Sequence, residues 1–100
     1  MPPPLISHFA YFSGGVFPPG TEQRWTFGPH GFGTSTVVLT AHPEPAIDTT
    51  TGFARRLAVT EIQSERAADE SHFVHVTVRN VGSTAAEFYS LWLTIITLQP

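Results

Sequence analysis

Apolar and polar residues alternate in short runs along the chain, and glycine and proline interrupt the runs about every ten residues. An alternation with a period of two puts one set of side chains on each face of a β-strand. In residues 72–79, for example, Val74, Val76 and Val78 share one face. Such spacing predicts an all-β antiparallel sandwich of about six to seven strands. The predicted strands are residues 6–13, 21–27, 35–41, 56–62, 72–79 and 86–98.

The alternation also predicts which side chains share a face. The pair Trp25 and Phe27 indicates that its face of residues 21–27 turns inward, because large aromatic side chains favour the core. The last predicted strand is apolar on both faces. The predicted sets are Gln23, Trp25 and Phe27; Val37, Leu39 and Ala41; and Leu57 and Val59, with Ile62 joining them across a bulge.

Turn chemistry separates these strands. Residues 17–20 predict a turn, since proline fixes φ near −65° and Gly20 tolerates φ > 0. Residues 80–82 end a strand abruptly: the Asn80 side chain is expected to hydrogen-bond the backbone two residues on, and Gly82 to adopt φ > 0. The segments 28–33, 42–52 and 64–71 are predicted to be an irregular loop, a long connection and a polar turn region.

A chain of 100 residues fits one domain, 1–100, in which residues 1–4 form a proline-rich N-terminal arm. The start has no basic region and no apolar helix, so it does not read as a signal peptide. No apolar run approaches the roughly 18 residues of a membrane span. We therefore expect no membrane insertion, and a cytoplasmic protein if Met1 is native or an extracellular one if the chain was trimmed from a secreted parent.

The net charge is −3, only 13% of residues are charged, and all five basic residues are arginines. Phosphate binding needs a concentrated basic face, so we expect no nucleic-acid partner. A weakly charged surface favours association with another protein surface. The chain contains no cysteine, which excludes disulfides and thiolate metal sites.

The strands at 57–63 and 72–83 and the apolar segment 86–93 together resemble the CARDB family, the cell-adhesion-related immunoglobulin-like modules of bacteria. The resemblance rests on an L-x-V-x-x-I strand, a V-x-V-x-N-x-G strand and an apolar strand after it. It covers about 40 residues and implies an immunoglobulin-like sandwich. Segments similar to the family's later strands, 17–27 and 33–41, come first here, so the strand order is circularly permuted relative to that family.

The permutation puts the first strand where an unpermuted module has its last one. Two such positions in a short chain favour strand exchange or edge pairing between subunits. We therefore expect a homo-oligomer, or docking on another protein, through strand edges and aromatic-rich loops.

Catalytic and metal-binding patterns are weak. His72 and His75 are three apart in a strand and point to opposite faces, and no nucleophile motif is present. The acidic residues near 61–70 read as a solvated face. We therefore expect no enzyme activity, no cofactor and no metal, with a small hydrolase as the weakest of the function classes considered.

The candidate binding residues are aromatic or lie on the glycine-rich segment. His30 and Phe32 sit on a loop tip, a suitable place for contacts. A planar row of exposed aromatic side chains would suit a sugar, which makes a carbohydrate-binding module the alternative function. The residues that could form this row are Phe9, Tyr11, Trp25, Phe27 and Phe32. The predicted binding residues are Trp25, His30, Phe32, Phe9 and Tyr11.

Overall fold

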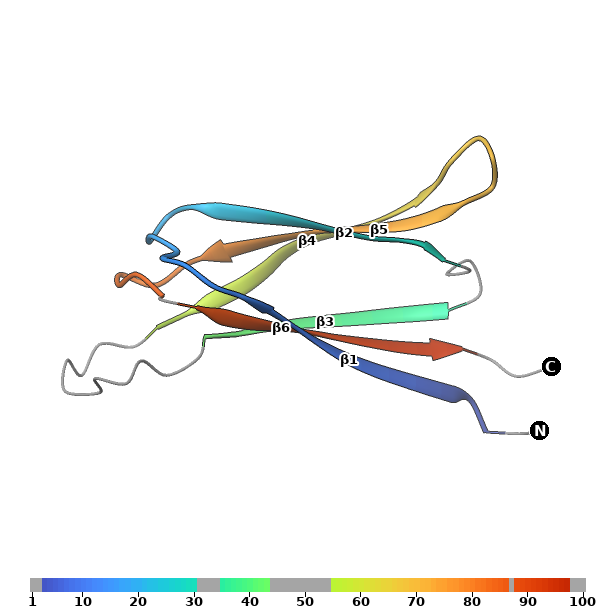
Figure 1. Ribbon diagram of the computed structural model, residues 1–100, viewed down its shortest axis with the longest axis horizontal. Helices are drawn as coiled ribbons and strands as arrows, with labels where there is room; N and C mark the ends of the chain where they lie inside the picture. Colours follow the sequence, from blue (N-terminus) through green and yellow to red (C-terminus); the bar gives the residue numbers. More distant parts are fainter. Residues whose placement is uncertain (1–2, 31–34, 44–54, 87, 98–100) are drawn as a thin grey trace.

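The computed structural model describes residues 3–30, 35–43, 55–86 and 88–97. This part of the chain contains six strands and no helix. The strands form two three-stranded antiparallel sheets, β1-β6-β3 and β2-β5-β4, which lie face to face (Figure 1). The predicted all-β sandwich of about six strands is confirmed. The strands are β1 (Leu5–Ser13), β2 (Glu22–His30), β3 (Ser35–Pro43), β4 (Leu57–Arg66), β5 (His72–Asn80) and β6 (Tyr89–Thr97).

The core lies between the two central strands, β5 and β6. Of the strands that follow one another in the sequence, only β4 and β5 pair as a hairpin, and every other successive pair lies in different sheets. Each central strand has neighbours on both sides and a whole sheet opposite, so most of its inward side chains are buried. The buried apolar residues are Phe17, Phe27, Leu39, Val74, Val76, Val78, Ala86, Tyr89, Leu91 and Leu93.

The predicted faces agree with the observed burial. Val74, Val76 and Val78 are buried, and Trp25 and Val59 pack against them from the flanking strands. The bulge predicted in β4 is present, as a register shift between Val59 and Glu61. Beyond it Ile62 pairs with Val76 but stays 46% exposed, because β4 is an edge strand and none of the described strands hydrogen-bonds to its far side.

Several predicted boundaries are wrong, because strand pairing overrides local turn signals. Gly28–His30 belong to β2, which pairs again with β5 after a bulge, so they are not loop. β4 continues through Arg66, and only residues 67–71 form the turn. β6 begins at Tyr89, whereas Ala86 pairs with Phe17 in an isolated bridge. β3 extends to Pro43, and the rest of the predicted connection 42–52 lies outside the described residues.

Two features were predicted for the end of β5, a local hydrogen bond of Asn80 and a positive φ at Gly82, and only the first is present. The backbone N–H of Gly82 donates to Asn80 Oδ1 at 3.0 Å, which is the predicted local hydrogen bond. Gly82 itself does not have a positive φ. It is glycine because a Cβ at this position would lie 3.0 Å from the backbone nitrogen of Arg56. The constraint is the close approach of a neighbouring segment, which the local sequence does not reveal.

Candidate functional site

The sheet β1-β6-β3 carries no charged side chain in any of its three strands. Every Asp, Glu and Arg within the described strands belongs to β2, β4 or β5. Monomeric sandwiches ordinarily place polar and charged residues on their outer faces. One outer face of this sandwich is therefore neutral, and the other carries the charge.

Strand β1 is the exposed edge of the neutral sheet. It pairs continuously with β6 on one side, from Leu5 to Ser13 and without a bulge, and among the described strands it has no partner on the other side. Most of its residues are exposed. Natural edge strands are usually protected by lysine, proline or a bulge. β1 has none of these devices, whereas β2 and β4 both have a bulge and charged residues, and β3 has contacts with β4.

The outer face of the neutral sheet combines exposed apolar side chains with uncharged polar ones. Ile6 and Phe12, both on β1, are 65% and 71% exposed, and Val38 on β3 is 47% exposed. At its centre the Trp92 ring stacks with the imidazole of His8 at a centroid distance of 5.1 Å. His42 lies on the other side, with its ring centroid 6.2 Å from that of Trp92. Removing the exposed apolar side chains of this face from water is favourable.

The structure brings three of the predicted binding residues near one another. Phe9 and Tyr11 line a groove of about 520 Å³, and Phe27 lies opposite them on β2. The Tyr11 ring lies 5.1 Å from that of Phe27 and 6.3 Å from that of Trp25. The groove opens where the edges of the two sheets face each other without hydrogen bonding.

Trp25 is turned towards the core and not towards solvent. Its indole Nε1 donates to the hydroxyl oxygen of Tyr89, which is buried, and its ring packs against the core cluster. His30 ends β2 opposite His72, but its side chain is not described. Phe32 lies outside the described residues. Of the five predicted binding residues, the structure therefore places Phe9 and Tyr11 at the groove and Trp25 beside it.

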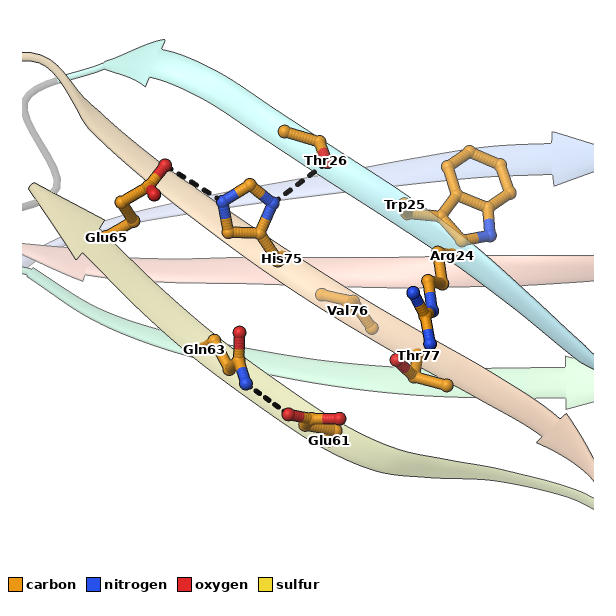
Figure 2. Close-up of a pocket in the computed structure, with 9 residues that line it drawn as sticks. All are labelled: Arg24, Trp25, Thr26, Glu61, Gln63, Glu65, His75, Val76 and Thr77. Carbon is orange, nitrogen blue, oxygen red and sulfur yellow. Dashed lines mark hydrogen bonds and ion pairs between the residues drawn. The ribbon is translucent and has the colours of Figure 1, made fainter. Parts of the chain in front are cut away.

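A second concavity lies on the outer face of the charged sheet (Figure 2). It has a volume of about 400 Å³. The strand registers place Thr77 between Arg24 and Glu61, and His75 between Thr26 and Gln63. No motif in the sequence predicts this site. Its only signal is that the outward positions of β2, β4 and β5 are mostly polar, a pattern that any solvated sheet face shares.

The polar side chains of this concavity hold one another in place. Thr26 Oγ1 lies 3.0 Å from His75 Nδ1, and His75 Nε2 lies 3.1 Å from Glu65 Oε1, so the imidazole bridges β2 and β4 (Figure 2). Gln63 Nε2 donates to Glu61 Oε1. The Arg24 guanidinium has no hydrogen bond or ion pair with any other part of the chain that the structure describes.

The hydroxyl, imidazole and carboxylate of Thr26, His75 and Glu65 follow the order of a catalytic triad. However, the side chains of His75 and Glu65 are 38% and 56% exposed. An open sheet face lacks the stabilisation of developing charge that a water-excluded site supplies. The arrangement is better suited to holding a polar ligand than to activating Thr26.

Across residues 3–30, 35–43, 55–86 and 88–97, no three His, Asp or Glu side chains come together in a way that could hold a metal ion. His72 and His75 lie on opposite faces of β5, since His75 shares the outer face with Thr77 and His72 shares the parity of the buried Val74. Within the same ranges, no helix has the length and apolar character needed to cross a membrane.

Comparison with known proteins adds no assignment. The chain matches no protein-family model, no curated protein and no solved structure.

Proposed function

We propose that the protein is a non-catalytic interaction and assembly module, and that a second copy of the same chain is the partner of its β1 edge. The observation that supports this most is the character of β1, a regular nine-residue edge strand that is exposed, uncharged and unprotected. An edge of this kind is a ready template for another strand.

The pairing would follow a two-fold axis. Two copies of β1 would run antiparallel, so that each contributes the same surface to an isologous interface. The result is a continuous six-stranded sheet in the order β3-β6-β1-β1-β6-β3. Backbone hydrogen bonds would supply the affinity, and the exposed side chains Ile6 and Phe12 would pack against their counterparts.

Charge supports a second copy over a charged partner. The strands β1, β6 and β3 offer no ionic group to pair with an acidic or basic surface. A like surface brings no charge into the interface, so no desolvation penalty for an ion arises. The resemblance to CARDB modules agrees with an interaction role, and an immunoglobulin-like origin with permuted strand order is part of the same proposal.

Two matched lysine substitutions test the proposal. Phe12→Lys puts a charge on the exposed edge of β1, and Ile62→Lys puts the same charge at an exposed apolar position of β4, an edge strand of the opposite sheet. We expect the wild-type chain and Ile62→Lys to dimerise with the same concentration dependence in sedimentation velocity, and Phe12→Lys to stay monomeric. A monomeric wild-type chain at every concentration, or dimers that Phe12→Lys leaves intact, would overturn the proposal.

A further inference from the structure

We propose that the concavity on the outer face of β2-β5-β4 binds a neutral sugar of one or two rings. This binding would be independent of self-association. The proposed sugar site lies on the outer face of β2-β5-β4, whereas Phe9 and Tyr11, two of the aromatic residues that the sequence suggested for sugar binding, lie at the groove. The volume of about 400 Å³ falls within the range of roughly 300–1,000 Å³ that small-ligand sites occupy.

The lining suits a ligand whose groups both donate and accept hydrogen bonds. Glu61 and Glu65 are acceptors, Arg24 is a donor without a partner in the described chain, and Gln63 offers both. The register places Arg24 and Glu61 on either side of Thr77, two strand spacings or about 10 Å apart. Hydroxyl groups spread over a sugar ring can meet donors on one wall and acceptors on the other.

Other ligand classes fit less well. Glu61 and Glu65 are four residues apart on one strand, which separates them by about 13 Å, too far for both to bind one cation. The two carboxylates also repel a phosphate from the single guanidinium of Arg24. An apolar ligand would remove Glu61, Glu65 and Arg24 from water with no compensating hydrogen bond.

The site is also preorganised. The bonds Thr26–His75–Glu65 tie β2, β5 and β4 together and fix three side chains before a ligand arrives, which lowers the entropy cost of binding. Phe73 stacks on His75 with ring centroids 6.3 Å apart and planes 18° apart. This ring contact further restrains the His75 imidazole.

The test is a titration of the ¹⁵N-labelled wild-type chain with cellobiose, maltose and lactose, followed by amide chemical shifts. We expect saturable shifts at Arg24, Thr26, His75 and Thr77 with at least one sugar. Glu61→Ala should weaken that binding about tenfold, the loss expected for a hydrogen bond to a charged group. Glu22→Ala is the matched control, since Glu22 lies on the same face but pairs with Arg79 outside the concavity, and should leave the affinity unchanged.

Three results would overturn the proposal. One is the absence of saturable shifts with all three sugars at about 100 mM, well above a millimolar dissociation constant. A second is shifts confined to the groove at Phe9 and Tyr11, which would move the site. The third is a saturable shift with zwitterionic glycylglycine and none with the sugars. That result would mean that the separated charges of Arg24 and Glu61 determine which ligand binds.

Discussion

The indole Nε1 of Trp25 donates a hydrogen bond of 2.8 Å to the hydroxyl oxygen of Tyr89, a residue 64 positions away and in the other sheet. The Tyr89 hydroxyl in turn donates to Gln23 Oε1 at 2.6 Å. Trp25 and Gln23 both belong to β2, so one buried hydroxyl from β6 fastens the edge of the opposite sheet. This contact explains why Trp25 faces inward.

Removing that hydroxyl should destabilise the fold. Tyr89→Phe keeps the ring in the core but leaves the Trp25 N–H and the Gln23 amide oxygen without their partner. We expect the free energy of unfolding to fall by about 1–3 kcal/mol, the cost of an unsatisfied buried polar group. Urea denaturation followed by tryptophan fluorescence measures it. Tyr11→Phe, at a 38% exposed ring, should change the value by less than about 0.5 kcal/mol, and an equal loss in both variants would contradict the account.

Alkaline pH should weaken the fold through the same residue. Burial raises the pKa of Tyr89 above its ordinary value of 10.0. In the unfolded chain the hydroxyl therefore ionises first, so the stabilisation is present below about pH 10 and is lost as the pH rises through the folded-state pKa. The denaturation midpoint of the wild-type chain should fall more steeply above about pH 10 than that of Tyr89→Phe. Parallel pH profiles of the two proteins would exclude this role.

Asn80 should be the most sensitive polar residue in the core. It is 1% exposed. Its Nδ2 donates to the backbone oxygens of Phe17 and Thr84 at 2.9 and 3.0 Å, and its Oδ1 accepts from Gly82. Asn80→Ala removes all three bonds and should cost about 3 kcal/mol in thermal or urea unfolding, near the sum of three typical net contributions.

Asn80→Asp separates the donor role from the acceptor role. The carboxylate can still accept from Gly82, but it places an oxygen against the carbonyls of Phe17 and Thr84 and adds a buried charge. We expect this substitution to destabilise more than Asn80→Ala at neutral pH. An aspartate variant as stable as the wild-type chain would mean that only the Gly82 contact matters.

Gly28 should not tolerate a side chain. Its φ is +132°, and a Cβ there would lie 2.6 Å from the backbone oxygen of His72 and 3.0 Å from the Phe73 ring. Backbone strain at such a φ alone costs about 1–3 kcal/mol, so Gly28→Ala should lose at least about 2 kcal/mol of stability. Gly14→Ala is the control, because no atom lies within 4 Å of its Cβ position, and its midpoint in urea should match the wild type. Equal midpoints for both variants would refute the packing argument.

Sequence periodicity predicted the strands and their faces because burial acts on each strand locally. Val74, Val76 and Val78 alternate with polar residues because one face of this central strand is buried. The bulge before Ile62 and the local hydrogen bond of Asn80 follow from the same short-range rules. The predicted strand boundaries were wrong where pairing with a strand distant in sequence sets them. For example, pairing with β5 keeps Gly28–His30 in the sheet.

The candidate sites were harder to predict, because they depend on pairing. Trp25 was predicted both to lie on an inward face and to bind a ligand, and its hydrogen bond to Tyr89 agrees with the inward position. The polar concavity gathers Thr26, His75 and Glu65 from three strands, and no motif links them in sequence. The neutral sheet likewise cannot be predicted without knowing that β1, β6 and β3 are neighbours.

The distance between two spin labels tests the β1–β1 assembly most directly. The chain has no cysteine, so Val38→Cys on β3 provides one labelling position away from the β1 edge. In a continuous six-stranded sheet the two labels are five strand spacings apart, so pulsed electron paramagnetic resonance should give a distance near 25 Å, at about 4.8 Å per spacing. A much shorter distance, from stacking of the outer faces, or no dipolar signal at concentrations well above those of the sedimentation experiment would contradict edge pairing.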